Sequence, residues 1–141
     1  MAIIQAICSS FKQELMEGVH NFSVGGDVFK IALYGPSANL NSSTTAYAAT
    51  GEVSGTGYTS GGATLTSLGV AASGTAAYFN FSAVSWPAST IAAAGALIYN
   101  TSKSNKAVAV LSFGGTFYSA NSTFTLTFPP NTSQTALIIA Q

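Results

Sequence analysis

From Asn21 onward the sequence consists of short runs of β-branched and aromatic residues, separated by clusters of Gly, Ser and Asn. Near its end, Phe124, Leu126 and Phe128 alternate with threonines, which is the two-residue period of a strand with one buried face. The clusters favour turns. Candidate strands cover residues 28–34, 63–70, 75–81, 90–99, 106–113, 123–128 and 136–140. This pattern predicts a mainly β fold, either a β-sandwich or a jelly-roll-like domain.

One segment near the N-terminus has the pattern of a helix. Ser10 can serve as its N-cap, with Gln13 three residues later completing a capping box. Phe11, Leu15 and Val19 then follow at a spacing of four and form one apolar stripe. Because so short a helix is marginal by itself, we expect the stripe to be buried against the sheet or a neighbouring subunit. These three residues are the candidate interface.

The length of 141 residues is typical of one domain, and a hydrophobic fraction of 48% is enough to build a core. We therefore expect a single β-rich domain over 1–141. Residues 1–20 would form an N-terminal arm with the short helix, and residues 21–141 the β-sandwich.

Charged residues make up only 6% of the chain, against roughly 25% in an average soluble protein. They are Lys12, Lys30, Lys103, Lys106, Glu14, Glu17, Asp27 and Glu52. The formal net charge is zero, which favours association. We expect neighbouring subunits to cover much of the surface, although hydration by Ser, Thr and Asn alone is the alternative.

Charge and hydropathy also argue against several partners. The sequence has no basic patch, so we expect no nucleic-acid binding. Its longest apolar run, residues 91–99, is about half a membrane span, so we expect no membrane insertion. The N-terminus does not resemble a secretory signal, and Cys8 has no cysteine to pair with. We expect the chain to fold in a reducing cytoplasm.

Residues 51–62 contain five glycines, and Gly55-Thr56-Gly57 superficially resembles a phosphate-binding loop. No lysine follows at the required position, and no helical pattern begins after it. Turns and bulges that need positive φ explain these glycines with fewer assumptions.

The sequence contains no convincing combination of catalytic residues. His20 is the single histidine, and its sequence neighbours offer no partner. A Cys8–His20 dyad is formally conceivable, but a small cysteine among apolar residues is usually a core residue. The carboxylates suggest no acid–base pair or metal cage. We therefore expect a non-enzymatic protein with no catalytic residues, no cofactor and no metal site.

A carbohydrate-binding site formed by aromatic side chains fits the sequence better than a catalytic site does. Trp86, between Ser85 and Pro87, is a weak candidate for a glycan-binding or interface aromatic, and six tyrosines add further rings. Packing in the core or at an interface is the more common role of a lone tryptophan in a strand-rich fold.

The apolar runs 90–99 and 106–113 flank the polar segment 100–105, which predicts a hairpin with a long loop. The second run is apolar on both faces, as in a central or covered strand. Lys103 and Lys106 are either hydrated lysines at the loop tip or contacts to acidic groups of a partner. We favour the first interpretation, because exposed ion pairs contribute little energy.

Five stretches together resemble a family of small virion proteins of tailed bacteriophages. They are SSFKQEL (9–15), FKIALYG (29–35), EVSGTGYTSGG (52–62), GALIYNTSKSNKAVAVLSFGG (95–115) and FTLTFPP (124–130). They are spread over nearly the whole chain.

The resemblance implies a structural component of the virion, made and assembled in the host cytoplasm, and more specifically a capsid decoration or cement protein. Its expected partners are further copies of itself and the major capsid protein or other virion proteins. The alternative is a tail-associated, receptor-binding β protein that recognises a saccharide. The family carries no catalytic residues that could be transferred to this chain.

Overall fold

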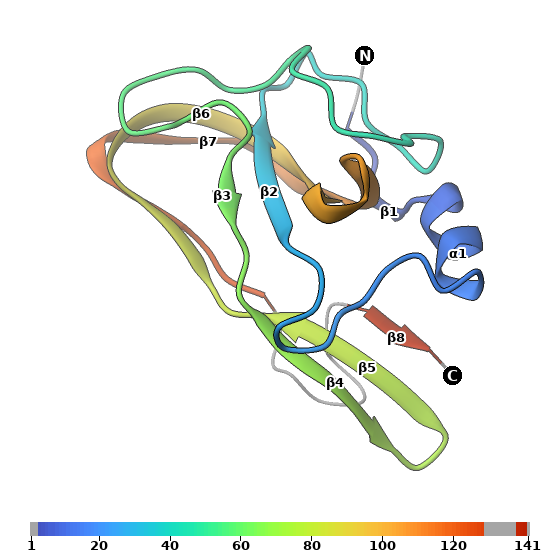
Figure 1. Cartoon of the computed structure of the whole chain (residues 1–141). Coiled ribbons are helices and arrows are strands. Elements are labelled where there is room, and N and C mark those ends of the chain that lie inside the picture. The colour runs from blue at the N-terminus through green and yellow to red at the C-terminus, as the bar shows by residue number, and fades with distance from the viewer. Residues whose placement is uncertain (1–2, 129–137, 141) are drawn as a thin grey trace.

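The computed structural model describes residues 3–128 and the backbone of 138–140 (Figure 1). The elements in chain order are β1 (Ala6–Ile7), α1 (Ser9–Met16), β2 (Phe29–Tyr34), β3 (Ala63–Thr64), β4 (Ser67–Ser73), β5 (Ala76–Phe81), β6 (Val84–Asn100), the 3-10 turn η1 (Thr101–Lys103), β7 (Lys106–Leu126) and β8 (Ile138–Ala140).

These strands form two antiparallel sheets. The larger has the order β1-β7-β6-β2-β3, and the smaller has the order β4-β5-β8. Strands account for 52% of the chain. The predicted mainly β, sandwich-like fold with a short N-terminal helix is confirmed. Residues 136 and 137 of the last predicted strand lie outside the described residues.

The predicted hairpin is confirmed as the pairing of β6 with β7. Asn100 pairs with Lys106 at the closed end, and Val84 pairs with Leu126 at the open end. The connecting residues begin with η1, where the side chain of Asn100 accepts a hydrogen bond from the backbone N–H of Ser102 at 3.0 Å. This side-chain cap satisfies a backbone donor that the turn leaves free.

Both hairpin strands are longer than predicted, because 106–113 and 123–128 belong to the single strand β7. The pairing shifts register several times, and Gly114 and Asn121 adopt positive φ of 77° and 47°. Residues that favour turns therefore form bulges here and bend the strand without ending it. In Figure 1, β6 and β7 curve together around one side of the molecule.

The glycines of residues 51–62 allow close approach of backbone segments. A Cβ atom at Gly57 would lie 2.7 Å from the Cα atom of Ser89, and one at Gly62 would lie 1.8 Å from the carbonyl oxygen of Ile31. Both glycines also have positive φ. The expected role of these glycines in turns and bulges matches this geometry, which brings the loop against β6 and β2.

Four phenylalanines join the two sheets. Phe29 comes from β2, Phe79 and Phe81 come from β5, and Phe22 comes from the segment between α1 and β2. The ring of Phe22 lies 4.4 Å from that of Phe29 and 3.6 Å from that of Phe79, measured between centroids. All four are buried. We call these residues the aromatic junction.

The predicted N-cap at Ser10 is wrong. Helix α1 begins two residues earlier than predicted, with Cys8 in the N-cap position and no side-chain capping bond. The backbone N–H of Ser9 donates to the carbonyl oxygen of Ser42 at 2.8 Å, so a neighbouring loop satisfies a donor that a cap would otherwise take. The hydroxyl of Ser10 is buried without a hydrogen-bond partner in the described part of the chain.

We predict that Phe22→Ala will lower the free energy of unfolding by about 3–5 kcal/mol, because it empties the centre of the aromatic junction. Chemical denaturation measures this loss. Tyr118→Ala is the control, since that ring is exposed and its truncation should change stability by less than about 0.5 kcal/mol. Equal effects of the two substitutions would contradict the role of the junction.

We also predict that Gly62→Ala will destabilise the fold by about 1–3 kcal/mol more than Gly25→Ala. The two glycines have φ of 83° and 81°, so both substitutions strain the backbone to the same extent. A Cβ at Gly25 meets nothing within 4 Å, whereas one at Gly62 collides with β2. The difference in thermal stability between the two variants measures the destabilisation caused by the steric clash with β2.

Candidate assembly surface

The predicted apolar stripe of α1 divides between the core and the surface. Phe11 is buried, with its ring centroid 4.9 Å from that of His20 and 5.7 Å from that of Phe22. Val19 is half-buried. Leu15 is 39% exposed, so the chain's own sheets do not cover it as expected. Its cover by a neighbouring subunit remains a prediction.

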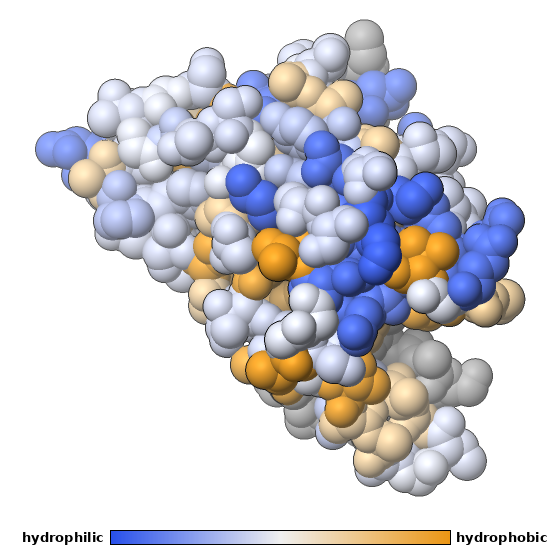
Figure 2. Space-filling view, viewed as in Figure 1, coloured by the Kyte–Doolittle hydropathy of each residue, from blue (hydrophilic) through white to orange (hydrophobic). Residues whose placement is uncertain are grey.

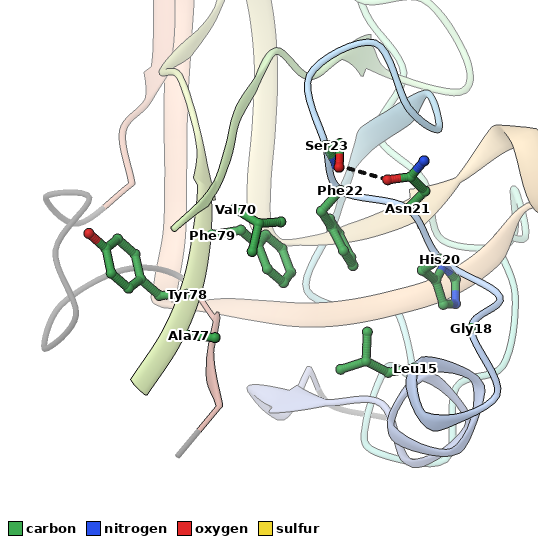
Figure 3. A pocket seen from close by; sticks show the side chains of 10 residues that line it. All are labelled: Leu15, Gly18, His20, Asn21, Phe22, Ser23, Val70, Ala77, Tyr78 and Phe79. Atoms are coloured by element: carbon green, nitrogen blue, oxygen red, sulfur yellow. Dashed lines mark hydrogen bonds between the residues drawn. The ribbon is translucent and has the colours of Figure 1, made fainter. Parts of the chain in front are cut away.

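Leu15 lies at a groove between α1 and the smaller sheet, with a volume of about 480 Å³ (Figure 3). The stacked rings of Phe22 and Phe79 line it, and Val70 of β4 lies next to them in this view. His20 and Gly18 lie at the helix side. The groove is mainly apolar, and half of its lining residues belong to the segment between α1 and β2.

Strand β4 is an edge of the smaller sheet and pairs with β5 on one side. Within the described residues no strand pairs with its other side. Its sequence, SLGVAAS, contains no charge and no proline, and most of it is exposed, including Leu68 and Val70. Natural edge strands are usually protected by a lysine, a proline or a covering segment. β4 has neither of the two protecting residues.

Exposed apolar side chains gather around this edge. Val24 lies beside it, since a Cβ at Gly69 would come within 3.4 Å of the Val24 side chain. Val70 and Leu15 line the same groove. We define the assembly surface as Leu15, Val24, Leu68 and Val70, all of them exposed. Figure 2 shows apolar residues over the lower sheet, below a band of hydrophilic residues that crosses the middle of this face.

A chain of hydrogen bonds fixes α1 beside this surface. The side-chain oxygen of Asn100 accepts from Ser102, so its amide nitrogen donates to His20 Nδ1 at 2.9 Å and to Asp27 at 2.8 Å. His20 Nδ1 is therefore an acceptor, and the ring proton on Nε2 is donated to Glu14 at 2.9 Å. His20 thus has two partners, Glu14 six positions away and Asn100 eighty positions away in the sequence.

The two hairpin lysines close this chain at either end. Lys103 Nζ lies 3.0 Å from Asp27 Oδ1, and Lys106 Nζ lies 3.4 Å from Glu14 Oε2. Both lysines remain partly exposed, but each also pairs with an acidic residue of its own chain, a partner that neither interpretation included. We call the connected side chains of Glu14, His20, Asp27, Asn100, Lys103 and Lys106 the polar clamp.

Glu52 belongs to a second polar cluster. Its carboxylate accepts hydrogen bonds from the hydroxyls of Tyr47, Tyr58 and Ser60 at 2.7, 2.6 and 3.1 Å, and from the backbone N–H of Gly61 at 2.8 Å. A carboxylate offers about four lone-pair sites, so these donors saturate it. Burial first, and then the bond to Glu52, raises the pKa of Tyr58. The cluster holds the glycine-rich loop in place and leaves Glu52 no free acceptor.

The other residues singled out in the sequence are buried. Trp86 is only 5% exposed and packs against Tyr58 and Phe124, so its face is not open to a glycan. Cys8 is fully buried, and burial followed by the charge of Glu14 raises the pKa of its thiol to about 11. A thiol with such a pKa is a poor nucleophile near neutral pH.

The described residues lack two features that would indicate a membrane span or a metal site. None of their helices has the length and hydropathy to cross a bilayer. They contain no group of three or more His, Cys, Asp or Glu side chains placed to hold a metal ion. In comparisons with known proteins, no protein-family profile, curated protein or solved structure matches the chain significantly.

We predict that Asp27→Asn will destabilise the protein by about 1–3 kcal/mol at neutral pH. Burial alone would raise the pKa of Asp27, but hydrogen bonds from Asn100, Asn21 and Lys103 outweigh it and hold the pKa below its usual value. A lowered pKa in the folded state stabilises above the unfolded pKa of about 3.8, and this stabilisation is lost as the pH falls through the folded pKa.

The difference between wild type and Asp27→Asn should therefore shrink below about pH 4 in denaturation curves taken across pH. Glu17→Gln is the matched control, because Glu17 is an exposed carboxylate that does not belong to the polar clamp. A pH-independent cost for Asp27→Asn would contradict an electrostatic role of the polar clamp.

Proposed function

We propose that this protein is a structural subunit of a tailed-bacteriophage particle, and specifically a decoration or cement protein of the head. The observation that carries the proposal is the assembly surface, an exposed and uncharged strand edge with apolar side chains around it. The low overall charge and the resemblance to small virion proteins support the same conclusion.

The occupant that best fits the edge of β4 is the β4 edge of a second copy. The outer side of an edge strand carries backbone N–H and C=O groups in the spacing of a β-ladder. An antiparallel pair of identical edges satisfies both sets of groups and gives a two-fold, self-complementary contact. Because β4 carries no charge, bringing two copies together creates no like-charge repulsion.

Contact with the head would then use the remaining apolar and hydroxyl-rich surface. A decoration subunit adds many modest contacts to a lattice, and apolar and hydrogen-bonded area supplies the binding free energy. A surface with few charges loses little by desolvation when it is covered. The major capsid protein is the proposed partner.

A tail-associated, saccharide-binding role is the second candidate function. The observation that favours it is the exposure of two neighbouring rings on β7, Phe117 at 54% and Tyr118 at 77%. Trp86, the aromatic residue that the sequence suggested for such a role, is buried.

We predict that Val70→Lys will weaken self-association about tenfold or more, since a lysine on the edge must lose hydration when two edges pair. Sedimentation velocity over a range of protein concentrations measures the association. Ile4→Lys is the control, because Ile4 is an exposed apolar residue outside the assembly surface. A wild-type protein that stays monomeric at all concentrations would refute pairing through β4.

The place in the particle requires a separate test. Quantitative mass spectrometry of purified particles of the encoding virus should find the chain at a copy number comparable with that of the major shell protein. A cryo-EM map should then place it on the head. Absence from purified particles would overturn the proposed function, and a tail position at low copy number would favour the second candidate.

A further inference from the structure

A second groove, unrelated to the assembly surface, lies on strand β7. Its volume is about 440 Å³, which is within the usual range for small-ligand sites. It shares no residue with the assembly surface. The side chains that matter most for binding chemistry are Phe113, Phe117, Tyr118, Thr123, Phe124 and Thr125. We call it the aromatic groove.

Two bulges in β7 produce this groove. Ala93 pairs with Phe117 and Gly95 with Ser112, so residues 113–116 stand opposite Ala94 alone. Between the pairs Ile91–Ser119 and Ser89–Ser122, residues 120–121 likewise stand opposite Thr90 alone. In a regular strand Phe117 and Tyr118 would point to opposite faces. Residues 117–119 pair regularly with residues 91–93, but the bend that the flanking bulges give β7 brings both rings to the lining of one groove.

The aromatic rings of the groove contact one another and, through Phe124, the buried ring of Trp86. Phe113 contacts Phe117 and Phe124 with centroid distances of 6.3 and 6.4 Å, and Phe124 contacts the buried Trp86 at 6.1 Å. Phe117 and Tyr118 are largely exposed. The exposed rings are therefore backed by a cluster of tilted aromatic rings that reaches the core.

The polar side-chain groups that line the aromatic groove beside the rings are all hydroxyls. Thr123, Thr125 and Tyr118 contribute hydroxyls, which both donate and accept hydrogen bonds. The Thr125 hydroxyl lies 3.3 Å from that of Ser85, which helps to orient it. From residue 107 to the C-terminus the sequence has no Asp, Glu, Lys, Arg or His. The groove therefore offers stacking and neutral hydrogen bonds, and no ionic contact.

A neutral saccharide matches this chemistry, because it has an apolar face of C–H groups and a rim of hydroxyls. We propose that the aromatic groove binds a neutral saccharide, with Phe117 and Tyr118 stacking on the sugar ring and the threonine hydroxyls contacting its rim. The inference goes beyond the particle role and holds for a subunit of the head or of the tail.

The test begins with the wild-type protein on an array of neutral oligosaccharides of glucose, galactose, mannose and N-acetylglucosamine. Sialylated and phosphorylated glycans on the same array are the charged counterparts. The expected result is binding to neutral glycans. Isothermal titration with the best soluble oligosaccharide then measures the affinity of each variant.

Phe117→Ala and Tyr118→Ala should each lower the affinity about tenfold, the loss of about 1.4 kcal/mol expected when one stacking ring is removed. Tyr118→Phe should lose less, because it keeps the ring. Met16→Ala, which truncates an exposed apolar side chain on α1, should bind like the wild type. Circular dichroism of each variant confirms that the fold is retained.

Three results would overturn the inference. They are the absence of binding to any neutral glycan, a preference for charged glycans, and binding that is unchanged in both ring variants. A shift in oligomeric state on Phe117→Ala without glycan binding would identify the groove as a subunit contact, which also refutes the proposal. None of these results depends on whether the chain is found in a virus particle.

Discussion

The pairing of β6 with β7 is the interaction on which the rest of the structure depends. β1 adds to the outer side of β7, β2 adds to the outer side of β6, and the segment before α1 is hydrogen-bonded to Val108. Residues 96–99 and 107–110, at the closed end of the hairpin, are all buried. Strands covered on both faces need apolar residues at every position, which is what these two runs contain.

Those features that depend on local periodicity could be predicted from the sequence. The hairpin, the short helix and the strand at 29–34 were predicted because each has a clear apolar pattern between turn-forming residues. The predicted strand 63–70 is divided in the structure into β3 and β4, which belong to different sheets. The separate strands 106–113 and 123–128 are one strand, because Gly114 and Asn121 bulge instead of turning. Turn and bulge need the same residue types, so composition does not distinguish them.

The polar clamp could not be predicted, because its members are far apart in the chain. His20 and Asn100 are separated by 80 positions, and Asp27 and Lys103 by 76. The burial of the apolar stripe on α1 was predicted in part: the helical period identified Phe11 as buried, but not that Leu15 would remain exposed. The sequence indicated Trp86, which is buried, and did not single out the exposed Phe117, for a related reason. Bulges change which side of a strand a residue faces, and the pattern of alternation does not reveal them.

The concentration of charge in the polar clamp has a consequence for how the protein should respond to ionic strength. Four of the chain's eight formally charged residues are used there, and the edge of β4 has none. Monovalent salt screens exposed ion pairs but has little effect on backbone pairing and apolar contact. Strongly hydrated salts such as sulfate strengthen apolar burial. Added sulfate should therefore strengthen the proposed pairing of β4 edges, while sodium chloride at moderate concentration loosens the attachment of α1 and leaves that proposed pairing unaffected.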